Sequence, residues 1–155
     1  MNPRREEAGR LKPAVGVRID LGQPTIVFVT VDAEQRVPWI AQPAVHQLLV
    51  EVWSEAQAWL VGYYLLMPDH LHLFAAPQNL DIPFNRWMSY WKRLFTQRAD
   101  NPEWHWQSLH WDTRLRRSES YAEKWNYIRE NPMRKGLVTK PEDWPYQGML
   151  NVLRW

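Results

Sequence analysis

Two histidines separated by one residue, His70 and His72, are the side chains of this sequence best suited to metal chemistry. They follow the turn signal Pro68-Asp69 inside the largely apolar stretch 64–74, so a β-hairpin is expected there. Because side chains alternate along a strand, both imidazoles should point to one face. Two adjacent imidazoles can begin a divalent-metal site, but they can equally be two histidines that happen to share a sheet face.

A second group of chemically able residues lies on a helix expected over 118–131. Its buried stripe follows the helical period and consists of Tyr121, Trp125 and Ile128. Tyr127 falls on the opposite, polar side, where Asn131 follows one turn later. The Asn131 side chain can offer a carbonyl oxygen beside the Tyr127 hydroxyl. The alternative is an exposed tyrosine whose ring simply lies on the surface.

Together these residues predict a phosphodiester chemistry. His70, His72 and the amide oxygen of Asn131 would hold a divalent cation that keeps open positions. Tyr127 would attack the phosphate, and the cation would polarise the phosphate. A phenol has a pKa of about 10, so it is a poor nucleophile until a cation or a base helps to remove its proton.

At this point the sequence resembles a known family. The segment 67–73 matches the His-hydrophobic-His motif of single-tyrosine HUH transposases, and the segment 127–138 resembles the tyrosine helix of REP-associated tyrosine transposases. The segment 111–116 is also similar to theirs, and the resemblance covers about residues 25–146. Many of these proteins carry an N-terminal Gly-Thr-Trp-His segment that helps to recognise hairpin DNA, and this sequence lacks it.

The resemblance implies an α+β fold, with a ferredoxin-like antiparallel sheet that carries the histidines on a central strand and helices packed on it. It implies Mg²⁺ or Mn²⁺, single-stranded or hairpin DNA, and a covalent 5′-phosphotyrosine. By position, His70 and His72 would be metal ligands, Tyr127 the catalytic nucleophile, and Asn131 its catalytic partner and a third metal ligand.

The basic residues suggest where DNA would lie. The net charge is only +2, but arginines gather locally. Such patches favour nucleic acid over a membrane surface. The expected DNA-binding residues are Arg86, Lys92, Arg93, Arg114, Arg116, Arg117 and Arg134. The alternative is that they form ordinary solvated faces. Most of the eleven tryptophans are expected in the core, with two or three available to stack on bases.

A length of 155 residues predicts one domain over 1–155. We expect a loose arm at 1–13, a first strand at 25–31, helices from about 43 and over 85–98, and a C-terminal extension at 139–155. The absence of cysteine excludes disulfides and thiolate zinc sites. No secretory signal or membrane span is recognised, so a cytoplasmic monomer or homodimer is expected.

The sequence thus predicts a metal-dependent endonuclease and strand transferase that acts on single-stranded, hairpin-bearing DNA. Two alternatives stay open. One is a non-catalytic DNA-binding module on the same scaffold. The other is a metal-dependent hydrolase that uses water and in which Tyr127 is structural.

Overall fold

The computed structural model describes residues 25–115 and 118–154. The predicted arm at 1–13 and the residues Arg116 and Arg117 lie outside this part of the chain. Within it, the strands form one antiparallel sheet in the order β4-β1-β3-β2-β5. The strands are β1 (Val27–Asp32), β2 (Trp59–Leu66), β3 (His70–Pro77), β4 (Trp111–Arg114) and β5 (Gln147–Met149).

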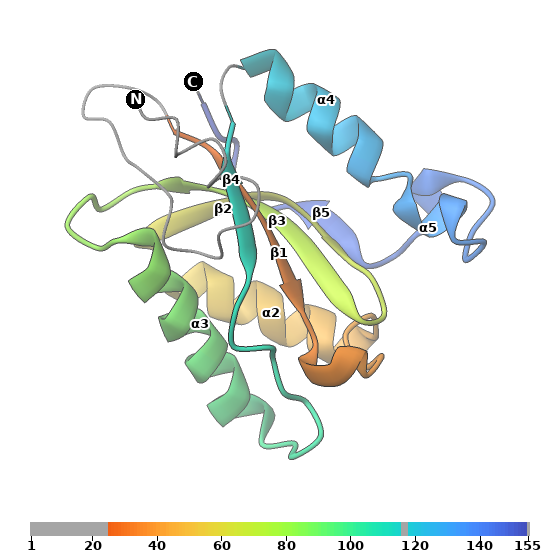
Figure 1. Cartoon of the computed structure of the whole chain (residues 1–155), viewed down its shortest axis with the longest axis horizontal. Helices are drawn as coiled ribbons and strands as arrows, with labels where there is room; N and C mark the ends of the chain where they lie inside the picture. The colour runs from red at the N-terminus through yellow and green to blue at the C-terminus, as the bar shows by residue number, and fades with distance from the viewer. Residues whose placement is uncertain (1–24, 116–117, 155) are drawn as a thin grey trace.

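The helices lie on both faces of this sheet (Figure 1). They are α2 (Pro43–Glu55), α3 (Phe84–Ala99), α4 (Ser118–Ile128) and the short α5 (Asn131–Arg134). Short 3-10 turns, η1 (Glu34–Arg36) and η2 (Pro141–Asp143), complete the elements. The order β1-α2-β2-β3-α3-β4, with β1 and β3 adjacent in the sheet, is the ferredoxin-like arrangement. The predicted α+β fold is therefore confirmed.

The central strand β3 separates two hydrophobic cores. Leu71 and Leu73 enter a core with the buried faces of α2 and α3. Phe74 enters the other core, together with Trp125 and Ile128 of α4. This is the alternation expected of a strand that is buried on both sides. It follows that every second residue of β3, including His72, faces the α4 side.

The helix expected to reach Asn131 ends three residues earlier, at Ile128. Pro132 has no amide hydrogen and cannot donate to the carbonyl of Ile128, so the helical ladder cannot continue through this point. Asn131 instead begins α5, with Pro132 in the tolerated first turn. Tyr127 and Asn131 therefore belong to two consecutive helices rather than to one.

The chain beyond α5 packs against the sheet and adds a strand that the sequence did not predict. The buried indole of Trp144 donates to the carbonyl of Leu66 at 2.9 Å, and β5 pairs with β2. Gly136, in the turn after α5, has a φ of +76°, a conformation that glycine adopts without strain.

Gly62 lies at an irregularity of β2, where a β-carbon would meet the Tyr121 hydroxyl and Leu153. Gly62→Ala should lower the free energy of unfolding by about 1–3 kcal/mol, because the added methyl group overpacks this contact. Urea denaturation measures the change. Leu153→Ala in the same background removes one of the obstructing side chains, so the double variant should lose less than the sum of the single losses. If Gly62→Ala is as stable as the wild type, Tyr121 and Leu153 move aside without a measurable cost in free energy.

Candidate active site

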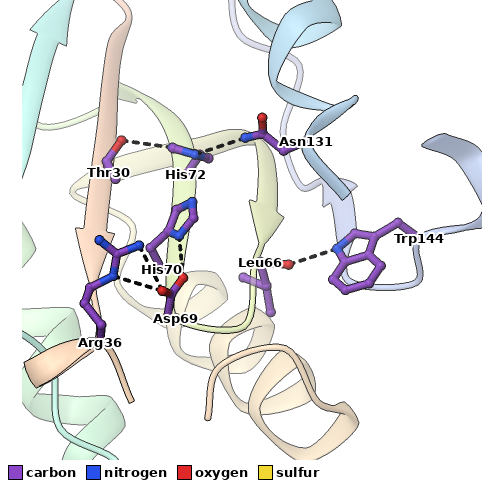
Figure 2. Close-up of polar contacts among 8 residues, drawn as sticks. All are labelled: Thr30, Arg36, Leu66, Asp69, His70, His72, Asn131 and Trp144. Carbon is purple, nitrogen blue, oxygen red and sulfur yellow. Dashed lines mark hydrogen bonds and ion pairs between the residues drawn. The ribbon is translucent and has the colours of Figure 1, made fainter. Parts of the chain in front are cut away.

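His70 and His72 lie side by side on β3, facing the α4 side of the sheet (Figure 2). Their ring centroids are 4.8 Å apart, with the ring planes at 77°. His72 is only 9% exposed, and His70 lies nearer the solvent. The shared face predicted from the sequence is therefore present in the structure.

Phe28 and Thr30 hold the ring of His72 in place. Its ring stacks on Phe28 at 5.3 Å, and its Nδ1 lies 2.9 Å from the hydroxyl of Thr30, the residue opposite it on β1. Burial lowers the pKa of His72 to about 3, and the neighbouring His70 and Lys124 act in the same direction. The imidazole is therefore neutral near pH 7, which is the form that ligates a metal ion.

His70 is oriented by a carboxylate. Its Nδ1 lies 2.8 Å from Asp69, which also receives Arg36 at 2.9 Å. Burial raises the pKa of Asp69, but the hydrogen bonds and charges of His70 and Arg36 outweigh burial and lower the pKa overall. An ionised carboxylate on Nδ1 leaves the Nε2 of His70 available, an arrangement typical of metal-ligating histidines.

Asn131 completes this cluster from α5. Its side-chain nitrogen lies 3.4 Å from Nε2 of His72, while its oxygen accepts a hydrogen bond from Arg134. A guanidinium can only donate, so the amide oxygen must face Arg134 and the NH₂ group must face His72. His72 then accepts at Nε2 and donates from Nδ1 to Thr30.

The donor set suits a divalent cation. Two imidazoles and one amide make three donors, and DNA phosphate or water can fill further positions. The described residues contain no group of three or more His, Cys, Asp and Glu side chains that could hold a metal ion. The amide beside the two histidines is that of Asn131, and its oxygen would have to turn away from Arg134 to serve as a third donor.

Tyr127 lies in the last turn of α4, on the same side of the sheet as the histidines, because Trp125 and Ile128 pack α4 there. The residue is 63% exposed. The guanidinium carbon of Arg134 lies 4.1 Å from the ring centroid. The structure thus brings His70, His72 and Asn131 into one cluster and joins Tyr127 to it through Arg134.

The basic residues predicted on α3 lie across the sheet from this cluster, because α3 packs in the other core. Arg86 and Arg93 line an open hollow of about 510 Å³ beside α2, and Arg93 lies 5.9 Å from the ring of Tyr90. Lys92 differs from them, because its ammonium donates to two backbone carbonyls at 3.0 and 3.3 Å. Burial lowers the pKa of Lys92 to about 8. Arg114 ends the edge strand β4.

A buried histidine, His110, lies close to Lys92. Its ring packs 5.9 Å from Phe84, and its Nε2 is 3.7 Å from Asp112. Burial lowers the pKa of His110 to about 4, and Lys92 adds to the effect. No sequence pattern singled out this residue.

Sequence reasoning also missed Thr30, Asp69 and Arg36 as supports of the histidines. Asp69 is visible inside the Pro-Asp-His-Leu-His motif and could have been found as a carboxylate adjacent to a candidate ligand. Thr30 and Arg36 reach the histidines and Asp69 only because β1 pairs with β3, and no local sequence pattern predicts that pairing.

No protein-family model matches the chain. It is 31% identical over 93 residues to the REP-associated tyrosine transposase of Escherichia coli (strain K12). The resemblance to REP-associated tyrosine transposases is confirmed. The match takes in 59% of this chain and 52% of the relative, so the chain spans about half the length of that transposase.

A solved structure of a REP-associated tyrosine transposase bound to a REP hairpin superposes with a TM-score of 0.70. The superposition covers 84% of this chain and 80% of the transposase, at 21% identity. At this identity the likeness establishes the fold. In the part of the chain that the structure describes, no helix combines the length and the apolar character needed to cross a bilayer.

Thr30→Val tests the support beneath His72. Valine keeps the shape but offers no acceptor to the buried Nδ1–H, so unfolding free energy should fall by about 1–3 kcal/mol. Urea denaturation measures it. Thr113→Val, on the exposed face of β4, is the matched control and should change stability by less than about 0.5 kcal/mol. Equal effects of the two substitutions would show that Thr30 does not support the histidine.

The two buried histidines predict a pH dependence. Their pKa values fall from 6.5 to about 3 and about 4 on folding. Below 6.5 the unfolded chain therefore binds protons that the folded protein excludes, so stability should decrease as the pH is lowered through this range. Urea denaturation across the range measures the slope. His110→Gln should reduce it by up to about 1.4 kcal/mol per pH unit. An unchanged slope would mean that His110 charges freely in the folded state.

Proposed function

We propose that this chain is a metal-dependent enzyme that cuts and rejoins single-stranded DNA through a tyrosine nucleophile. The observation that carries the proposal is the cluster of His70, His72 and Asn131 on the sheet face that also bears the Tyr127 helix. The name of the Escherichia coli relative, a tyrosine transposase, supports the same chemistry. The substrate would be hairpin-bearing single-stranded DNA, in keeping with the REP hairpin bound by the structural relative.

The reaction exchanges one phosphorus–oxygen bond for another. The phenol oxygen of Tyr127 forms a bond to the phosphorus, and the bond to the 3′ oxygen breaks. The phenol gives up its proton, and the leaving 3′ oxygen takes one up, so a free 3′ hydroxyl and a 5′-phosphotyrosine result. Attack by a 3′ hydroxyl on this linkage would rejoin the strand and release Tyr127.

The chain's own residues would prepare this step. Thr30 and Asp69 hold the two imidazoles through Nδ1, so Nε2 of His70 is available and Nε2 of His72 faces Asn131. His70, His72 and, after its amide turns, Asn131 would hold Mg²⁺ or Mn²⁺, which when bound polarises the phosphate and offsets its developing charge. The 63% exposure of Tyr127 leaves it open to an incoming strand.

Basic side chains would guide the DNA through contacts to its phosphates. Arg114 lies on the edge strand β4, and Arg86 and Arg93 lie on the far face. Lys92 is the weakest candidate for a phosphate contact on α3, because its ammonium already donates to two backbone carbonyls. Arg116 and Arg117 stay predictions outside the described residues.

One observation favours an alternative. Because the ring of Tyr127 is exposed and contacts Arg134, it could be a structural residue of a metal-dependent hydrolase that uses water. The two functions differ in their products, since a hydrolase leaves free ends and no protein–DNA adduct.

Tyr127→Phe separates these possibilities. The phenylalanine keeps the ring and removes only the oxygen that would bond to phosphorus, so DNA binding should persist while the covalent adduct disappears. The measurement is incubation with hairpin single strands and Mn²⁺, followed by a denaturing gel. Cleavage by the phenylalanine variant at the wild-type rate would exclude the tyrosine mechanism.

His72→Ala is the companion variant. It leaves Tyr127 in place and removes one imidazole, so metal-dependent cleavage and adduct formation should both be lost. Binding of the same DNA, measured without metal, should remain. A His72→Ala protein that cleaves normally would remove the histidine cluster from the mechanism.

A further inference from the structure

Arg134 contacts both Tyr127 and Asn131, the two candidate catalytic residues. It donates to the backbone carbonyl of Tyr127 at 2.7 Å and to the side-chain oxygen of Asn131. Its guanidinium lies over the Tyr127 ring at 4.1 Å, and it contacts Glu130 at 3.3 Å. The side chain is about one third exposed, with an exposed fraction of 34%. One side chain thus bridges the end of α4 and the start of α5.

The donor-only character of Arg134 decides the orientation of Asn131. An amide can turn either way unless its neighbours distinguish oxygen from nitrogen. Arg134 can only donate and therefore pairs with the amide oxygen, so the NH₂ group is directed at Nε2 of His72, 3.4 Å away. The same contact therefore keeps the amide oxygen turned from the position where a cation between the histidines would meet it.

Its contacts with Tyr127 have a second effect. Residues 129 and 130 separate the two helices and belong to neither. The bond from Arg134 to the Tyr127 carbonyl spans this junction, and the guanidinium covers one face of the ring. Both hydrogen bonds leave the same nitrogen, Nη2, while the planar guanidinium lies over the ring, and a lysine has no such planar group.

We propose that Arg134 is a positioning residue that couples Asn131 to Tyr127. In the state described here it holds the amide oxygen away from the histidines and fixes the α4–α5 junction. When the amide turns to present its oxygen to a cation, Arg134 loses that acceptor, so cation loading and the placement of Tyr127 are linked. This inference rests on the proposed function for its consequence, but the amide orientation is a property of the protein alone.

The decisive experiment observes the Asn131 side chain without metal or DNA. Heteronuclear NMR of the side-chain NH₂ group, assigned with Asn131→Asp, should give in the wild type a signal with a cross-relaxation contact to the His72 ring. In Arg134→Lys this contact should weaken or vanish, because the lysine nitrogen lies one bond nearer the backbone than Nη2 and has no planar group to lie over the Tyr127 ring. Arg129→Gln is the matched control: it removes a charge from the junction, and its own contact is a 4.0 Å pair with Glu142. An unchanged Asn131 signal in Arg134→Lys overturns the proposal.

A second readout is Mn²⁺ affinity measured by calorimetry. Freeing the amide oxygen should raise the affinity in Arg134→Lys by about tenfold, the equivalent of one hydrogen bond to a charged group. The lysine keeps the positive charge, so a gain cannot come from relieved repulsion. The gain should be absent when Asn131→Ala is added. A gain that persists with Asn131→Ala, or no gain at all, overturns the coupling to the cation.

The two proposals fail differently. If the wild type binds no Mn²⁺ and forms no adduct, the proposed function fails, while the NMR comparison still decides the role of Arg134. If adduct formation occurs, Arg134→Lys should lower its kcat and leave the KM for DNA little changed, because ring placement rather than strand binding is lost. A change in KM alone would mean that Arg134 binds DNA phosphate instead.

Discussion

The burial of His72 is the constraint on which the rest of the site depends. His72 is buried and stacks on Phe28, so a ring nitrogen without a hydrogen-bond partner would lower the stability of the fold. Thr30 satisfies one nitrogen and Asn131 meets the other. Because Thr30 belongs to β1 and Asn131 to α5, the two hydrogen-bond contacts of the His72 ring connect the sheet to α5.

The amino-acid sequence anticipated the parts of this arrangement that local periodicity controls. Alternation along β3 correctly placed both histidines on one face, and β-branched and apolar runs located the main strands. The helical period placed Trp125 and Ile128 in the core beneath Tyr127. The strand β5 escaped prediction because Gln147-Gly148-Met149 has no strand pattern of its own and exists through its pairing with β2.

Other features depended on contacts between distant segments, which the sequence does not display. Thr30 and His72 meet because two strands pair in one register. The face on which α3 packs is likewise a property of the whole fold, so its arginines could not be assigned to a side of the sheet in advance. The helix boundary before Asn131 was visible in Pro132, but its effect reached one turn further back than expected.

The separation of the two sheet faces limits the route of any long ligand. The histidine cluster and the hollow near Arg93 lie on opposite sides of a layer whose interior is filled by side chains. A polynucleotide that touched both could not pass through this layer and would have to wrap around one of its edges. At one of those edges lies β4, only four residues long, and Arg114 is its last residue. The edge strand β4 would then lie where the polynucleotide turns from one face of the sheet to the other.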